Sequence, residues 1–253
     1  MEPKVFLIVC PLIFLAGFID AIGGGGGLIS LPAYLLAGLP PHTAIATNKL
    51  SSCMGSTVAT IRLCRGGHVY WRLAIFTVIV AVLGSSIGAN LNLLVSDEIM
   101  VYILVAVLPV TAFIVLNKKL FRDNTDQSES PELTKRTWIV ASLAALIIGA
   151  YDGFYGPGTG TFLILAFTVF ARLDVRTANA HTKIINLTTN ITSLVVFLLN
   201  GEGIILLGLT AGLCNMVASY LGAGLMLKNG TKIVRPAIIL VLVLLLVKVL
   251  FFR

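Results

Sequence analysis

Four charged residues lie inside long apolar stretches of the sequence: Asp20, Lys49, Asp152 and Lys183. A charge at the centre of a membrane helix costs about 2.5–3.5 kcal/mol on the gentler insertion scale, so each group needs a partner or water. One interpretation is purely structural and predicts two salt bridges, Asp20 with Lys49 and Asp152 with Lys183. The functional interpretation adds that both lysines bind a substrate anion and that the aspartates neutralise them when the site is empty. Proton transfer by the aspartates is an open alternative to simple pairing.

A polar stripe begins at each lysine. Residues three and four positions apart share one face of an α-helix. This spacing aligns Lys49 with Ser52 and Ser56, and Lys183 with Asn186 and Asn190. Such a stripe requires a cavity or a polar partner, and hydrogen bonding between helices is the ordinary alternative to a ligand. We expect the substrate to be bound by the lysines and their polar neighbours: Lys49, Lys183, Asn48, Ser52, Asn186 and Asn190.

Two glycine-rich runs, Gly23–Gly27 and Gly156–Gly160, interrupt apolar segments. Glycine and proline cost roughly 1 and 3 kcal/mol inside a helix, so the helix must break at each run. The pieces that follow, 28–37 and 161–171, are only about 15 Å long and too short to cross a bilayer. We therefore expect re-entrant hairpins, with a flexible linker between two ordinary spans as the alternative.

The start of a half-helix exposes unpaired N–H groups and the positive end of the helix dipole, which together favour an anion. Glycine also lets a ligand approach the backbone closely. The breaks thus add backbone donors to the expected site, at Gly25, Gly26, Gly158, Thr159 and Gly160.

The composition identifies the class of protein. Of the 253 residues, 57% are hydrophobic and 11% are charged, and the mean hydropathy is +0.99. Soluble domains carry roughly 25% charged residues, so a soluble globular protein and a disordered chain are both excluded. The net charge of +7 reflects orientation in the membrane rather than binding of nucleic acid. The four cysteines lie scattered in apolar stretches without metal-ligand spacing, and we expect neither a metal nor a cofactor.

Uncharged runs of about 20 residues predict the membrane spans. We expect an all-α polytopic membrane protein made of two homologous halves, each with one broken hairpin and three transmembrane helices. The first half, 1–117, contains a hairpin at 5–37 and helices at 43–64, 72–94 and 97–117. A cytoplasmic linker at 118–136 leads to the second half, 137–253. This half contains a hairpin at 137–171 and helices at 175–199, 203–227 and 233–251.

The two halves repeat each other in sequence. The glycines and the aspartate around the first break recur at the second, where Gly17, Asp20, Gly24 and Gly26 become Gly149, Asp152, Gly156 and Gly158. The motif Thr43-Ala44-x-Ala46-x-x-Lys49 likewise recurs as Thr177-Ala178-x-Ala180-x-x-Lys183. Three full crossings are an odd number, so the second half enters the membrane from the opposite side, which is an inverted-topology repeat. The distribution of basic residues agrees, since Lys and Arg are concentrated in the expected cytoplasmic segments 62–72, 118–136, 172–176 and 228–235.

These residues resemble the sulfite exporter TauE/SafE family, and in particular its YfcA-like members. The resemblance rests on GFIDAI at 17–22, LPPHTA at 39–44 and TNKL at 47–50, and on YDGFYGPGTG at 151–160 and ANA at 178–180. It implies a bacterial-type inner-membrane transporter whose relatives are linked to sulfite and small organosulfur anions. One departure is His181-Thr182 before Lys183, where the family usually has alanine directly before the lysine.

We therefore expect a secondary transporter that moves sulfite or another sulfur-containing oxyanion, such as a sulfonate or thiosulfate, across the plasma (inner) membrane. The alternatives are a passive anion channel and a transporter of a small organic anion without sulfur. An enzyme is not expected, because no serine or cysteine nucleophile has a convincing base. The expected partners are the small anionic substrate and the lipid bilayer, with no nucleic acid. A coupling proton and a second copy of the chain are further partners that the sequence leaves open.

Overall fold

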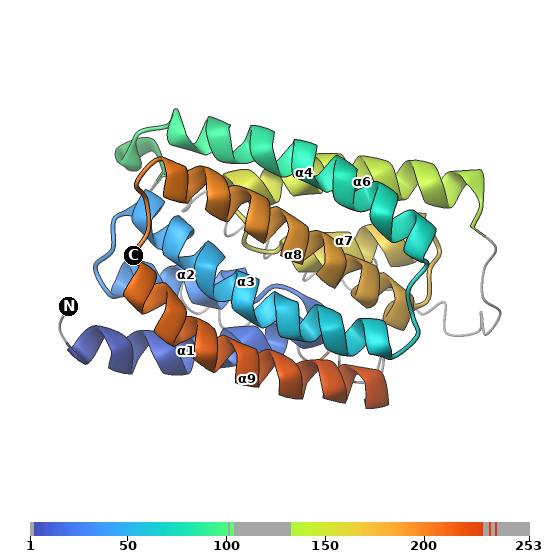
Figure 1. Cartoon of the computed structure of the whole chain (residues 1–253), viewed down its shortest axis with the longest axis horizontal. Coiled ribbons are helices and arrows are strands. Elements are labelled where there is room, and N and C mark those ends of the chain that lie inside the picture. Colours follow the sequence, from blue (N-terminus) through green and yellow to red (C-terminus); the bar gives the residue numbers. More distant parts are fainter. Residues whose placement is uncertain (1–2, 101, 104–132, 230–232, 234–235, 237–253) are drawn as a thin grey trace.

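The computed structural model describes residues 3–100, 102–103, 133–229, 233 and 236 (Figure 1). The described residues form helices joined by short loops, with no strand among them. Two predicted helices lie outside the described residues for most of their length, 97–117 beyond residue 103 and nearly all of 233–251. The predicted linker 118–136 also lies outside them up to residue 132.

The first half contains four helices up to Leu93, and residues 97–100 and 102–103 after them are also helical. The four are α1 (Pro3–Gly23), α2 (Gly27–Leu36), α3 (Pro41–Arg65) and α4 (Trp71–Leu93). Gly24 and Gly25 between α1 and α2 have φ values of 75° and 83°, a conformation that side chains with a Cβ disfavour. Pro41 begins α3, where the missing N–H of proline has no cost. The glycine run therefore breaks the chain into a long helix and a short half-helix, as a re-entrant hairpin requires.

The second half repeats this order. It consists of α6 (Lys135–Phe154), α7 (Thr159–Leu165), the π-helical turn η2 (Ala166–Phe170), α8 (Val175–Leu199) and α9 (Ile205–Asn229). α7 continues directly into η2, so one short helical segment runs from Thr159 to Phe170. The Asp174 side chain caps α8 by accepting from the N–H groups of Arg176 and Thr177 at 3.0 and 3.1 Å. The helices in the described part begin and end close to the predicted bounds.

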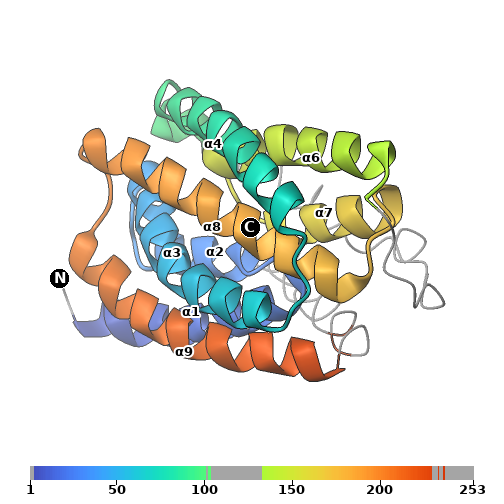
Figure 2. The same cartoon turned by 45° about the vertical axis from the view of Figure 1, so that its right-hand side comes forward.

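The helices lie in three tiers, as Figures 1 and 2 both show. α4 and α6 pack together on one side and α1 and α9 on the other, with α3 and α8 between them. The first helix of each hairpin therefore packs on a helix of the other half, α1 on α9 and α6 on α4. In Figure 1 α3 and α8 run in opposite directions. The two halves are interleaved rather than placed side by side.

Glycines allow the closest helix contacts, and these contacts recur between the halves. A Cβ on Gly88 of α4 would lie 1.9 Å from the Ala150 carbonyl oxygen of α6, and one on Gly222 of α9 would lie 2.4 Å from that of Phe18 in α1. Gly88 corresponds to Gly222 in the sequence repeat, and Phe18 corresponds to Ala150. Small residues permit such close packing in membranes, where apolar burial itself does not drive helix association.

The outer surface is apolar. Ile75, Ile79, Leu83, Ile87 and Leu91 recur every four residues on α4, and each is at least half exposed. Five described helices, α1, α4, α6, α8 and α9, are long and apolar enough to cross a bilayer. Water cannot be the solvent of such a face, so lipid must cover it. The protein is a multi-pass membrane protein.

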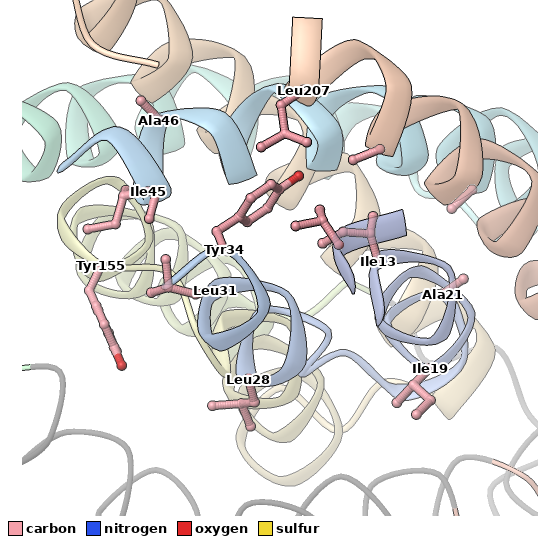
Figure 3. Packing of buried hydrophobic residues seen from close by; sticks show 14 of the residues in the cluster. Ile13, Ile19, Ala21, Leu28, Leu31, Tyr34, Ile45, Ala46, Tyr155 and Leu207 are labelled. Carbon is pink, nitrogen blue, oxygen red and sulfur yellow. The ribbon is translucent and has the colours of Figure 1, made fainter. Parts of the chain in front are cut away.

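The half-helix α2 is buried through its own apolar side chains (Figure 3). Tyr34 has no exposed surface and donates its hydroxyl to Ser51 Oγ of α3 at 2.8 Å. Leu28 and Leu31 belong to the same buried cluster, which also includes Leu207 of α9. α2 therefore lies inside the protein from Leu28 to Tyr34, as a non-spanning helix in a membrane requires, and only its last residue, Leu36, is exposed.

Candidate functional site

The two glycine breaks meet at the centre of the molecule. A Cβ on Gly24 would lie 2.4 Å from the backbone nitrogen of Thr161, and one on Gly27 would lie 3.0 Å from Cα of Pro157. The Thr161 hydroxyl also donates to the Gly23 carbonyl at 3.3 Å. The starts of α2 and α7 are thus brought together from opposite halves of the chain.

A cavity of about 40 Å³ lies at this junction. That volume holds about three water molecules. Most of the sequence-predicted site residues line it: Asp20, Gly25, Gly26, Asn48, Lys49, Ser52, Asp152, Gly158, Thr159, Gly160, Asn186 and Asn190. The polar stripes of α3 and α8 therefore face a common space rather than lipid.

Lys49 is paired across the two halves of the chain. Its ammonium donates to the backbone carbonyl of Asp152 at 2.6 Å and lies 3.1 Å from Asp152 Oδ1. The other carboxylate oxygen of Asp152 accepts from the Thr189 hydroxyl of α8. Both charges are almost fully buried, with side-chain exposures of 2% and 6%. The end of α6 is thereby held to α3 and α8 together.

Lys183 makes the corresponding pair with Asp20. Its ammonium lies 2.5 Å from Asp20 Oδ2, and Oδ1 of the same carboxylate accepts the Gly26 N–H at 3.1 Å. The Lys183 side chain has no exposed surface, whereas that of Asp20 is 29% exposed. Asp20 thus connects α8 to the start of α2.

The salt bridges predicted within each half are wrong. Asp20 pairs with Lys183 instead of Lys49, and Asp152 pairs with Lys49 instead of Lys183. The prediction placed each hairpin against the helix that follows it in sequence. In the structure α1 packs mainly on α9 and α6 mainly on α4, so the carboxylate beside the break of each hairpin reaches the lysine of the other half.

Lys183 is the one predicted binding residue that does not line the cavity. The sequence predicts both lysines in the site because each is a charge inside an apolar stretch and begins a polar stripe. Which of two repeat-related groups reaches a cavity depends on side-chain packing, which no pattern of residue types reveals.

Several lining residues were outside the predicted set. Ser30 and Ser56 line the cavity. Ser30 lies near the first break and Ser56 lies on the Lys49 stripe, so the sequence contained a signal for both.

Asn215 of α9 also lines the cavity, but no pattern in the sequence marked it. Its amide donates to the Ser51 carbonyl at 3.0 Å and accepts from the Ser219 hydroxyl at 3.0 Å. It fits between α1 and α3 because the nearest residues there are Gly17 and Gly55.

The sequence of the whole chain identifies its family. The model of the family described as "Sulfite exporter TauE/SafE" matches residues 9–249. The chain belongs to this family. The TauE/SafE assignment covers both breaks and both lysines, and it makes the protein a membrane transporter rather than an enzyme.

Individual relatives agree with the TauE/SafE assignment. A probable membrane transporter protein, ORF9, of Sinorhizobium sp is 35% identical over 94% of this chain and 89% of its own length. The probable membrane transporter protein YfcA of Escherichia coli K12 is 34% identical over 95% of this chain and 88% of its own. A probable membrane transporter protein of Haemophilus influenzae is 34% identical over 90% and 87%. No solved structure matches the chain.

Proposed function

We propose that this TauE/SafE protein is a secondary transporter of a small sulfur-containing oxyanion, such as sulfite. The observation that carries the proposal is the cavity in which the Lys49 ammonium and the starts of α2 and α7 face the same space. Cations and free backbone N–H groups both favour a negatively charged ligand. The family description names sulfite, and sulfite is the smallest member of the proposed substrate class.

The charges around the cavity sum to about one positive charge, which a ligand with a single negative charge would balance. The carboxylates of Asp20 and Asp152 cancel the two ammonium groups of Lys49 and Lys183. Each helix N-terminus contributes roughly half a positive charge. Two such ends supply about one positive charge, which balances a monoanion in a place where an unbalanced charge is costly. A dianion would require a proton to accompany it.

The exchange of hydrogen-bond partners provides a coupling mechanism. An entering anion competes with the aspartates for the same ammonium and N–H donors. Because both ion pairs join opposite halves, weakening either one loosens a contact between the halves. Binding is then linked to movement of one half against the other, as alternating access requires. A proton on a displaced carboxylate would preserve the charge balance.

An inverted-topology repeat is part of this proposal. It is supported by the close helix contacts at repeat-related glycines and by the opposite directions of α3 and α8 in Figure 1. Corresponding hydrogen bonds also hold the residues just before α9 and α4. The Ile204 N–H donates to Thr47 Oγ1 of α3 at 2.9 Å, and the Tyr70 N–H donates to His181 Nε2 of α8 at 3.1 Å. Thr47 and His181 occupy matching positions in the repeated motif.

Cysteine labelling tests the topology. The exposed residues Arg65 and Asn200 stand at equivalent ends of α3 and α8. In a variant lacking the native cysteines, a membrane-impermeant thiol reagent is expected to label Arg65→Cys only from the cytoplasm and Asn200→Cys only from outside. Intact cells and inverted vesicles provide the two orientations. Labelling of both positions from one side would contradict the inverted repeat.

Binding and counterflow test the transport activity. The purified protein is expected to bind sulfite more tightly than sulfate. Near neutral pH sulfite is partly the monoanion hydrogen sulfite, whereas sulfate stays a dianion, and a site that balances one charge penalises a second. Calorimetry against sulfite, thiosulfate, sulfate, a sulfonate and acetate measures this order. In proteoliposomes, unlabelled sulfite on the far side is expected to accelerate uptake of labelled sulfite. A passive channel shows no such acceleration, and preferential binding of acetate would favour a non-sulfur organic anion instead.

A further inference from the structure

The two lysines that the repeat relates occupy unequal places in the structure. Lys49 lines the cavity, whereas Lys183 does not and has no exposed surface. Asp20 lies between Lys183 and the cavity, since its carboxylate lines the cavity and one of its oxygens meets the Lys183 ammonium at 2.5 Å. A ligand in the cavity can therefore reach one ammonium and not the other.

The Lys49 ammonium has one N–H donor left for a ligand. An ammonium group has three N–H donors, and the two acceptors at Lys49 are the carbonyl and Oδ1 of Asp152. Asp152 is held from its other side by the Thr189 hydroxyl, so it can stay in place when an anion binds. Gly156 leaves this space open, because a Cβ there would lie 3.2 Å from Nζ of Lys49.

The polar lining is also unequal between the two halves. Asn48 and Asn215 both line the cavity. The residues that correspond to them in the sequence repeat are Thr182 and Ala81. Both of these are fully buried and neither lines the cavity. Asn186 and Asn190 of α8 face the same space as Ser52 and Ser56 of α3. The amides of Asn48 and Asn215 are additional donors that have no lining counterpart in the other half.

The Lys183–Asp20 pair instead connects α8 to the start of α2. The Asp20 carboxylate accepts from the Lys183 ammonium of α8 and from the Gly26 N–H at the start of α2. This contact joins the second half to the break of the first hairpin. An anion at the start of α2 competes with Asp20 for the Gly26 N–H. Loss of that contact would detach the start of α2 from the Lys183–Asp20 pair and so from α8.

We propose that Lys49 is the one of the two lysines that binds the anion, and that the Lys183–Asp20 pair is a latch that holds the start of α2 to α8 and is opened by the bound anion. This division of roles rests on the proposed transport function. It assigns binding to one ion pair and conformational coupling to the other.

The test separates binding from transport in the purified protein. Lys49→Met is expected to weaken sulfite binding at least about tenfold, since a hydrogen bond to a charged group is lost. Lys183→Met is expected to bind sulfite within about threefold of the unmodified protein but to lose counterflow in proteoliposomes. Calorimetry measures binding, and labelled sulfite measures exchange.

Matched double variants keep the test valid if a single substitution impairs folding. Lys49→Met/Asp152→Asn and Lys183→Met/Asp20→Asn leave no unpaired charge at either pair. The first is expected to lose sulfite binding and the second to retain it. Equal losses of binding in both, or a larger loss at Lys183, would overturn the division of roles. An unmodified protein that binds none of the anions in the panel would instead contradict the transport proposal itself.

Discussion

Removal of the Asp152 carboxylate is expected to lower the free energy of unfolding by about 3–5 kcal/mol, the usual cost of leaving one partner of a buried ion pair alone. In Asp152→Ala the Lys49 ammonium stays almost fully buried without its counter-charge, and Thr189 loses the carboxylate that it contacts. Equilibrium unfolding in mixed detergent micelles measures the loss.

Two double variants distinguish the observed pairs from those expected within each half. Lys49→Met/Asp152→Ala removes an observed pair as a unit and is expected to recover most of the lost stability. Lys49→Met/Asp20→Ala removes one member from each observed pair, and it leaves Asp152 and Lys183 buried without partners. This second variant should be the less stable of the two. The reverse order would mean that the lysines pair within their own halves.

Gly24→Ala is expected to disrupt the junction of the two breaks and abolish counterflow. The φ of Gly24 is 75°, and an alanine Cβ would lie 2.4 Å from backbone atoms of Gly160 and Thr161. Left-handed backbone costs an alanine about 1–2 kcal/mol, and overpacking adds about 1–3 kcal/mol. The neighbours are backbone atoms that also line or flank the cavity, so they cannot move without deforming it.

Gly38→Ala is the matched control for this substitution. Gly38 has a similar φ of 87°, but its added Cβ would meet no atom within 4 Å. The control therefore includes the backbone strain without the steric clash, and it should retain counterflow. The same unfolding and exchange measurements apply to both variants. Equal effects at the two positions would show that strain alone, and not contact between the breaks, explains the loss.

Much of the site was predictable from residue types and their spacing. Asp20, Lys49 and Asp152 were identified because a charge in an apolar stretch is costly, and the stripe positions, such as Ser52, followed from helical spacing. All of these line the cavity. The partners of the charges were not predictable, because pairing depends on which helices meet. Asn215 escaped detection for the same reason, since it lies on α9, far in sequence from the breaks it approaches.

The sequence by itself determined the membrane class, the positions of the two breaks and the approximate bounds of the helices that the structure describes. Hydropathy and the cost of glycine and proline in a helix act over a few neighbouring residues, so a single segment is enough to reveal them. Only the tertiary structure decided that the ion pairs cross between the halves and that Lys49, unlike Lys183, faces the cavity. These features arise because the first helix of each hairpin packs on a helix of the other half, α1 on α9 and α6 on α4. Such contacts depend on the shapes of surfaces that lie far apart in the sequence.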